Sequence, residues 1–459
     1  MKTEKTATPI CDFVRAYKES GTVRAHMPGH KGEAVIGPEA LDITEIAGAD
    51  ELYGASGIIR ESERIASELF GTGRTLYSAE GSSLCIRCML YLALLNAKSA
   101  FPSESRQRFT VLAGRNAHRT LVSAAALLDL DIGWLPAEQT DILSCRTDIR
   151  ALDELLAEAE EQKELPIAVY ITSPDYLGNI ENIRSVAAVC HWHGVPLLVD
   201  NAHGAYLKFL PESMHPIDLG ADICCDSAHK TLPCLTGAAY LHINRAAPRL
   251  FAEQAEAALA LFASTSPSYL ILQSLDAANL YISDRYLEKL AAFIEKLDAL
   301  KTRLVSRGFT LVGSEKLKLT LAPKAFGYTG RELAQHLRDN GVECEFSDPD
   351  YTVLMPAPGM GKEGLAVVET ALLSVEKRTP ISETPPRIPS PRRVCTVREA
   401  VLAPQERLSA ELAAGRILGN DHVSCPPAVP IVVPGETIDA DALACFRYYG
   451  IGKCTVVAE

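Results

Sequence analysis

The segment DSAHKTLPCLTG, residues 226 to 237, brings together groups that could do chemistry: a lysine directly after a histidine, with hydroxyl side chains and a proline around them. Burial among apolar residues lowers the pKa of an amine, which leaves more of it in the neutral, nucleophilic form. Lys230 is therefore the first candidate catalytic residue of this chain, and His229 beside it is the second.

Other polar residues directly follow segments that the sequence predicts to be strands. In a parallel sheet covered by helices, ligand sites lie at the carboxyl ends of the strands, so residues at these ends are expected to share one crevice. The polar residues concerned are Asp200 at the end of VPLLVD, His203 after it, Ser227 after ADICCD and His118 after RFTVLAG, with Ala202 between Asp200 and His203. Ser82 and Ser83 end SAEGSS, just before a predicted helix.

This combination of an acid, a lysine and a hydroxyl-rich helix start matches the needs of pyridoxal phosphate. The cofactor needs a lysine for a Schiff base and an acid that keeps its ring nitrogen protonated, so that the ring can act as an electron sink. It also needs a phosphate cradle, which the backbone N–H groups at a helix start and the hydroxyls of Ser82 and Ser83 can provide. The Gly-Ser-Ser pattern alone is also an ordinary helix cap.

Several ordered motifs carry a resemblance to a known family over most of the chain. They include HMPGHKG (26–32), DITEIAGADELYGASGIIRESERIASELFG (42–71), TSPDYLGN, DNAHGAY and DSAHKTLPCLTGAAYLH. With these motifs the chain resembles the fold-type I, pyridoxal-phosphate-dependent ornithine/lysine/arginine decarboxylases, in the short form without an N-terminal wing domain. Near the end, GRI and PPAVPIVVPGE look like the C-terminal domain of that family.

The resemblance implies roles for individual residues at a cofactor site. Lys230 would bind the cofactor as a Schiff base, Asp200 would pair with its pyridine nitrogen, and His229 would sit near the reacting centre of the substrate. The other implied cofactor contacts are Ala202 under the ring, His118 on its other face, His203 without a defined role, and Ser82, Ser83 and Ser227 on the phosphate.

The resemblance also implies a homodimer with shared active sites, because a loop matching Thr265 and Ser266 reaches the phosphate site of the neighbouring subunit in this family. The implied reaction converts lysine, ornithine or arginine into a diamine or agmatine and carbon dioxide. A carboxylate suits the distal cation of such a substrate, and Glu345 in VECEFSD, with Asp348 behind it, is the candidate. A solvated strand end is an equally good interpretation of Glu345.

Two other functions remain open at this point. An aminotransferase or lyase of the same fold would keep the cofactor and break a different bond. A catalytically silent relative would act as a binding or regulatory partner, although the presence of Lys230, Asp200 and the serines argues against it.

The elements that must position these residues follow a regular alternation. From about residue 60 to 245, short apolar segments at 108–114, 166–173, 195–200, 221–227 and 238–244 read as strands and alternate with helical segments. This alternation predicts a mostly parallel sheet with helices on both sides. The expected fold class is α/β, with an aminotransferase-like, fold-type I large domain and smaller α+β C-terminal domains. The expected domains are residues 1–306 with an N-terminal arm and the cofactor site, 307–380 as a small α/β domain, and 381–459 as a linker and C-terminal domain. The proline-rich, charged run 384–393 suits the linker.

Composition excludes several classes of partner. The 459 residues carry a net charge of −13 without a basic, aromatic-rich run, which argues against nucleic acid. Apolar runs are too short to span a membrane, and no secretory signal is visible, so a soluble, cytoplasmic protein with reduced thiols is expected. No metal is expected at Cys85 and Cys88, at His191 and His193, or at Cys224 and Cys225, because no second ligand pair has zinc spacing.

Some positions depart from the family pattern. In GRILGNDHVSCPPAVP, Asn420 stands about where an acid is usual, Cys425 replaces a tyrosine and Ala428 replaces a glycine. A different substrate preference or weak activity would follow if the missing acid touches substrate. In DNAHGAY, Asn201 stands where an acid is commoner.

Overall fold

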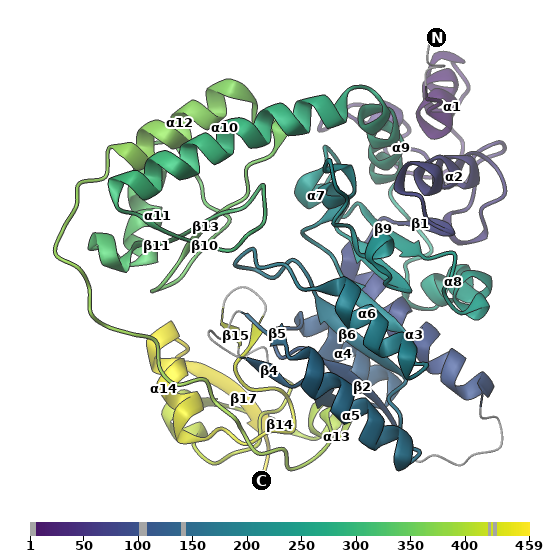
Figure 1. Cartoon of the computed structure of the whole chain (residues 1–459). Helices are drawn as coiled ribbons and strands as arrows, with labels where there is room; N and C mark the ends of the chain where they lie inside the picture. The colour runs from purple at the N-terminus through teal and green to yellow at the C-terminus, as the bar shows by residue number, and fades with distance from the viewer. Residues whose placement is uncertain (1–5, 101–107, 139–143, 421–423, 426–428) are drawn as a thin grey trace. The chain divides into compact units, whose positions relative to one another are not determined.

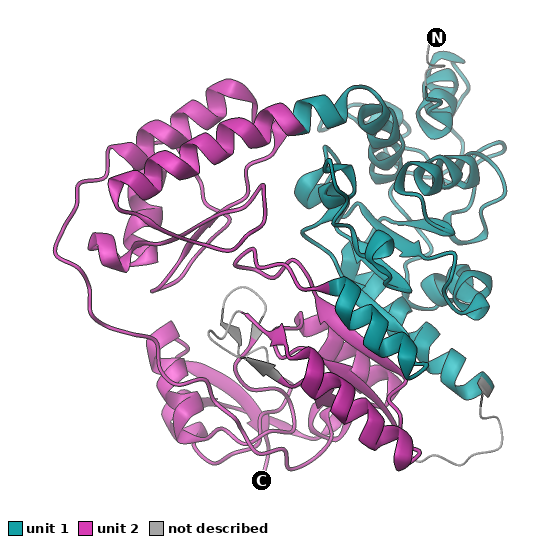
Figure 2. Cartoon of the chain, viewed as in Figure 1, with its two compact units in different colours: residues 1–104, 183–290 teal, residues 105–182, 291–459 magenta. Residues whose placement is uncertain are grey.

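The computed structural model describes residues 6–100, 108–138, 144–420, 424–425 and 429–459. The chain divides into two compact units, each built from segments that are far apart in the sequence. Unit 1 comprises residues 1–104 and 183–290, and unit 2 comprises residues 105–182 and 291–459 (Figure 2).

Unit 1 contains four neighbouring strands in the order β1 (Arg74–Ser78), β9 (Ala239–Ile243), β8 (Ile223–Asp226) and β7 (Leu197–Asp200). Strands β7 and β8 are parallel, with Asp200 opposite Cys225, whereas β9 is antiparallel to both β8 and β1. Every residue of β7, β8 and β9 is buried, as expected of strands covered on both faces. The carboxyl ends of β7 and β8 therefore lie side by side.

Helices surround these strands (Figure 1). Gly81 starts α3 (Gly81–Ala100) with φ of +72°, a left-handed conformation that glycine adopts without strain and that turns the chain sharply after β1. The other helices of unit 1 are α1 (Pro9–Glu19), α2 (Ile58–Phe70), α6 (Ile183–Trp192), α7 (Ala228–Thr231), α8 (Arg249–Phe262) and α9 (Tyr269–Ser283), and α10 (Tyr286–Arg307) leads into unit 2.

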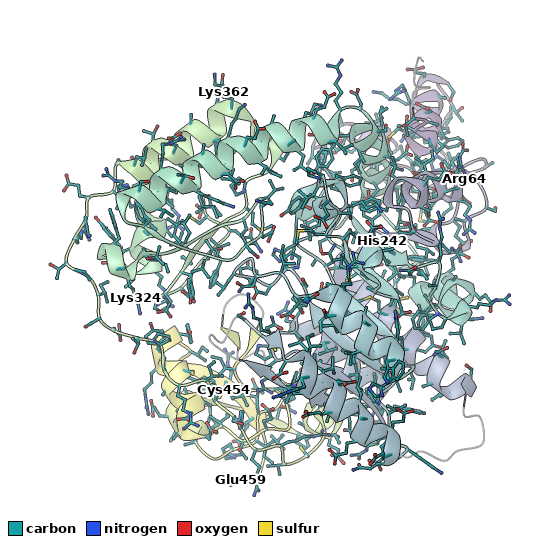
Figure 3. All side chains as sticks on the ribbon, in the orientation of Figure 1. Arg64, His242, Lys324, Lys362, Cys454 and Glu459 are labelled. Atoms are coloured by element: carbon teal, nitrogen blue, oxygen red, sulfur yellow. The ribbon has the colours of Figure 1, made fainter. Side chains whose placement is uncertain are left out.

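Unit 2 contains three parallel strands in the order β6 (Ala168–Thr172), β2 (Phe109–Ala113) and β3 (Leu130–Trp134), with the helices α4 (Arg119–Leu128) and α5 (Ile149–Glu161). A separate antiparallel sheet has the order β10 (Thr310–Val312), β11 (Leu319–Ala322), β13 (Thr352–Leu354) and β12 (Phe346–Ser347). Its helices are α11 (Gly330–Asp339) and α12 (Gly361–Leu373), and Lys362 on α12 is exposed (Figure 3).

The C-terminal part of unit 2 follows a stretch without regular structure that includes the predicted linker 384–393. Leu418, Phe446 and Val456 of this part form one buried cluster with Leu177 and Val353 from the rest of the unit. Its elements are α13 (Val397–Leu402), β14 (Gln405–Ser409), β15 (Ser424–Cys425), β16 (Val429–Pro430), α14 (Ala440–Tyr449) and β17 (Lys453–Val457).

The expected α/β fold class with a mostly parallel set of strands is confirmed. The segments predicted as strands at 108–114, 166–173, 195–200, 221–227 and 238–244 contain β2, β6, β7, β8 and β9. Among the described pairings of β1, β2, β3, β6, β7, β8 and β9, only those of β9 with β8 and with β1 are antiparallel. Within the described residues, no helix is long and apolar enough to cross a membrane. The three domain ranges stay a prediction.

Candidate functional site

Lys230 and His203 meet in unit 1. Lys230 lies on α7, a single helical turn that begins two residues after β8, and its backbone N–H donates to the carbonyl of Ser227. His203 follows β7, and its Nε2 atom lies 3.0 Å from Nζ of Lys230. The neighbouring parallel strands β7 and β8 thus bring the candidate nucleophile and a buried imidazole into hydrogen-bond contact.

Asp200 is the last residue of β7 and is only 2% exposed. Its Oδ1 atom accepts a hydrogen bond from the backbone N–H of Ala202 at 3.2 Å and from the thiol of Cys225 at 3.6 Å. Ala202 is also buried, and its side chain is only a methyl group. These features fit the predicted contact between Asp200 and a pyridine nitrogen.

Two hydroxyls meet at the start of α3. The Ser227 hydroxyl donates to Oγ of Ser82 at 2.8 Å, and Ser83 is the next residue of the helix. The N–H of Gly81 donates to the carbonyl of Gly237 at 2.7 Å, which holds the helix start against the segment after Lys230. Paired hydroxyls at the N-terminus of a long helix suit a phosphate group.

His229 and the loop 263–268 also lie in unit 1. The Nδ1–H of His229 donates to the carbonyl of Ala238 at 2.8 Å, which leaves Nε2 as the proton-accepting atom of the neutral ring. Thr265 and Ser266 are exposed, and the N–H of Ser264 next to them donates to Oε1 of Glu80 at 2.7 Å. The loop therefore lies beside the residue that precedes Gly81 in its own chain.

The remaining predicted site residues belong to unit 2. His118 caps α4, and its Nδ1 atom accepts from the backbone N–H of Thr120 at 3.2 Å. Glu345 is exposed and accepts a hydrogen bond at 3.0 Å from the hydroxyl of Tyr176. Asp348 is fully buried, and its Oδ1 atom accepts from the backbone N–H groups of residues 350 and 351, so it stabilises the turn between β12 and β13.

The positions that depart from the family pattern lie in different settings. Asn420 is exposed, and its backbone N–H donates to the side chain of Gln405 at 2.8 Å. Ala428 and the side chain of Cys425 lie outside the described residues. Asn201 is fully buried, and its side-chain amide donates to Oδ1 of Asp226 at 2.6 Å.

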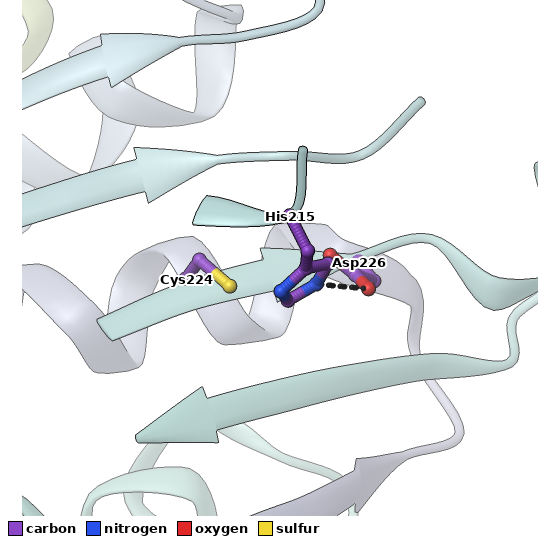
Figure 4. A group of neighbouring side chains, drawn as sticks. All are labelled: His215, Cys224 and Asp226. Carbon is purple, nitrogen blue, oxygen red and sulfur yellow. Dashed lines mark hydrogen bonds and ion pairs between the residues drawn. The ribbon is translucent and has the colours of Figure 1, made fainter. Parts of the chain in front are cut away.

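Sequence reasoning missed the network around Asp226. Its Oδ2 atom accepts from Nε2 of His215 at 3.1 Å (Figure 4). It also accepts from Nε2 of His242 at 3.2 Å, and all three side chains are fully buried. A buried carboxylate needs hydrogen-bond donors. The position of Asp226 within a predicted buried strand was therefore the sequence signal that such donors lie nearby. Burial raises the pKa of the Asp226 carboxyl, but the two histidines outweigh this effect and hold the pKa well below its usual value.

A metal-ligand grouping overlaps this network. His215, Cys224 and Asp226 each offer a ligand-type atom, and these atoms lie within 4.8 Å of one another. Sequence spacing groups Cys224 with Cys225 instead, and no metal is expected there. The hydrogen bonds from the two histidines and Asn201 account for both carboxylate oxygens of Asp226 without an ion.

Comparisons with known proteins identify the family of this chain. The family model of the Orn/Lys/Arg decarboxylase major domain matches residues 8–366. The chain is 27% identical to the Bacillus subtilis protein YaaO, over 95% of this chain and 93% of that protein. It is also 27% identical to an arginine decarboxylase of Halalkalibacterium halodurans, over 96% of this chain and 93% of that protein.

Solved structures show the same fold. The lysine decarboxylase LdcF of Francisella novicida superposes with a TM-score of 0.76 at 16% identity, over 98% of this chain and 79% of that one. The members of the matched family and the fold neighbours are pyridoxal-phosphate-dependent enzymes, and the decarboxylases among them act on small amino acids. With its family model matched over most of its length, this chain belongs to the Orn/Lys/Arg decarboxylase family.

Proposed function

We propose that this protein is a pyridoxal-phosphate-dependent decarboxylase of a basic amino acid, with arginine as its first candidate substrate. The observation that carries the proposal is the 3.0 Å contact between Nζ of Lys230 and Nε2 of His203, at strand ends that also present Asp200 and Ser227. Lys230 would hold the cofactor covalently. Asp200 would keep its ring nitrogen protonated, and Ser82, Ser83 and Ser227 would bind its phosphate.

The cofactor, when bound, supplies an electron sink for the electron pair of the broken bond between the α-carbon and the carboxylate. The protein must then orient that bond and return a proton to the α-carbon. Nζ of Lys230 is one proton donor, and His203 can hold or take up a proton at Nε2 beside it. His229 is the other candidate: because its Nδ1–H is held by the carbonyl of Ala238, it would first take up a proton at Nε2 and then deliver it from that atom.

Arginine is favoured by the names of the curated relatives. Four of them, each matched over at least 93% of this chain, are named arginine decarboxylase. The Glu345 carboxylate would accept hydrogen bonds from the guanidinium of arginine, and the hydroxyl of Tyr176 would hold this carboxylate in place. Lysine and ornithine are the second candidates, and the product, agmatine or a diamine, would belong to polyamine biosynthesis.

We infer that the enzyme is a cytoplasmic homodimer with shared active sites. The support is the resemblance of the exposed loop that carries Thr265 and Ser266 to the loop that crosses between subunits in this family. His118 would contribute to the same site by stacking on the cofactor ring.

A product assay tests the reaction. The purified protein, supplied with pyridoxal phosphate, should release carbon dioxide and agmatine from arginine faster than diamine and carbon dioxide from lysine or ornithine. Borohydride should fix the cofactor to Lys230 and not to Lys362, which is exposed on α12. Formation of an oxoacid without carbon dioxide would identify a transferase instead, and fixation of the cofactor without any turnover would identify a silent relative.

A further inference from the structure

We propose that Asn201 and Asp226 form a positioning pair that sets the ends of β7 and β8, and with them Asp200 and Ser227, for cofactor binding. Asn201 directly follows Asp200, and Asp226 directly precedes Ser227. The hydrogen bond from Nδ2 of Asn201 to Oδ1 of Asp226 measures 2.6 Å, so it joins the neighbours of two proposed cofactor contacts. The inference rests on the proposed cofactor site and does not depend on which amino acid is the substrate.

Asn201 and Asp226 lie in a buried environment in which Asn201 must donate the hydrogen bond and Asp226 must accept it. Asn201, Asp226, His215 and His242 are all fully buried. A buried carboxylate must receive hydrogen bonds, and Asp226 receives three from side-chain N–H groups, one on Oδ1 and two on Oδ2. A second carboxylate at position 201 would lie 2.6 Å from the first and repel it, so the amide of Asn201 is complementary to Asp226.

Neighbouring side chains fix the orientation of the network. Nε2 of His242 donates to the Asp226 carboxylate, so Nδ1 of the neutral ring has no proton and accepts from the Thr75 hydroxyl, which lies 2.9 Å away. Burial keeps the pKa of His242 below its usual value, so this neutral form persists. On the other side, a Cβ atom at Gly204 would lie 2.0 Å from Oδ1 of Asn201, so only glycine leaves room for the amide in this orientation.

The backbone around the pair shows what it positions. The N–H of Asn201 donates to the carbonyl of Cys225 at 3.0 Å, one residue beyond the last strand pairing of Asp200 with Cys225. The side-chain bond between Asn201 and Asp226 extends this connection past the end of the backbone ladder. Loss of the bond would let the Asp200 and Ser227 segments move apart, whereas the strand pairing itself would remain.

The chain provides a matched control at the opposite end of the same two strands. Asp222 precedes β8, and its Oδ2 atom accepts from the backbone N–H of Leu197 at 2.8 Å and from His191 at 2.9 Å. Asp222 therefore also joins β7 to β8 through a buried carboxylate, but at their amino ends. Asp222→Asn is expected to lower the melting temperature and leave the cofactor affinity within about threefold of wild type.

The test compares Asp226→Asn, Asn201→Asp and the exchange variant that carries both substitutions. Each single variant should weaken pyridoxal phosphate binding, titrated by fluorescence on the apoprotein, by about 10- to 100-fold, because a buried hydrogen bond to a charged group is lost. Each should also shift the visible absorption maximum of the bound cofactor. The exchange variant reverses the bond, because the amide at position 226 then donates to the carboxylate at position 201 while its carbonyl accepts from both histidines. This variant should bind the cofactor at least about threefold more tightly than either single variant, with incomplete recovery because the carboxylate at position 201 receives one hydrogen bond where Asp226 receives three.

The outcomes separate this inference from the proposed reaction. Asp226→Asn with wild-type affinity and spectrum, or a folded exchange variant that stays as weak as the single variants, would overturn the positioning role. Stoichiometric zinc that is lost in Cys224→Ser would also overturn it, because Asp226 would then be a metal ligand. If a single variant does not fold, recovery of folding and affinity in the exchange variant supports the pair. The expected affinities without decarboxylation of any basic amino acid would support the pair and reject the proposed reaction.

Discussion

The side chains of Lys230 and His203 come from the ends of two neighbouring parallel strands and meet with Nζ 3.0 Å from Nε2. This contact gives the candidate nucleophile a partner that can exchange a proton with it. His203→Gln should therefore lower kcat for arginine by about 100-fold, the usual size of a general acid–base contribution, while the affinity for pyridoxal phosphate changes less than about threefold. Stopped-flow and steady-state kinetics measure this effect, and the half-exposed His191 provides the control in His191→Gln. A parallel loss of cofactor affinity would instead make His203 a binding residue.

Removal of the Ser227 hydroxyl should weaken the binding of the cofactor phosphate. Ser227→Ala and Ser82→Ala each remove one member of the hydroxyl pair at the start of α3, so each should raise the dissociation constant for pyridoxal phosphate by about tenfold. Pyridoxal, which lacks the phosphate, should bind these variants and the wild type equally. Ser99→Ala, at the exposed end of the same helix, is the control. Equal weakening of pyridoxal binding would place the two serines elsewhere than at the phosphate.

Substitution of Glu345 should change substrate recognition and leave the chemical step intact. Glu345→Gln should raise KM for arginine by about 10- to 100-fold with kcat within a few fold, because it removes the charge that would pair with the guanidinium. Tyr176→Phe should have a smaller effect in the same direction, since the hydroxyl only holds the carboxylate. Glu343→Gln, two residues away and paired with Arg338, is the matched control. An unchanged KM in Glu345→Gln would leave Glu345 as a solvated strand end.

Mixed dimers test whether the active sites are shared. Lys230→Ala and the double substitution Thr265→Ala, Ser266→Ala should each inactivate the homodimer. If the loop serves the neighbouring subunit, dimers formed from both variants should regain about a quarter to a half of wild-type activity, since one intact site forms from the two chains. The alternative is that the loop serves its own subunit, because the N–H of Ser264 donates to Glu80 of the same chain. Without any regain, the loop would serve its own subunit.

Buried Glu63 should make stability depend on pH. Burial raises its pKa from 4.5 to about 8, although the N–H of Tyr77 on Oε1 opposes this effect. Between these pH values the folded chain holds a proton that the unfolded chain releases, so stability is full below about pH 4.5 and falls as the pH rises toward 8. Glu63→Gln should remove this loss, on the order of 4 kcal/mol at pH 8.

Urea unfolding of the wild type and Glu63→Gln at several pH values measures that difference. Exposed Glu61 lies on the same helix, so Glu61→Gln should leave the pH profile of the wild type unchanged. Identical profiles for the wild type and Glu63→Gln would mean that Glu63 stays ionised in the folded protein.

The sequence by itself determined the fold class and predicted the central residues of the proposed site. Buried parallel strands are near-continuous apolar runs, and this local pattern located β2, β6, β7, β8 and β9. Strand direction and crossover helices restrict the topology, so the carboxyl ends of parallel strands lie at one edge of the sheet. From this rule the sequence predicts that one site contains Lys230, Asp200, His203, Ser227 and Ser82.

Only the tertiary structure decided which polar groups pair inside the protein. His215 and His242 lie 11 and 16 residues from Asp226 along the chain, and no local pattern shows that both reach the same carboxylate oxygen. Asn201 was visible as a departure from a family pattern, but its meaning depends on a neighbour on the next strand. Hydrogen bonds between side chains depend on register, rotamer and burial, which packing sets and which sequence spacing does not encode.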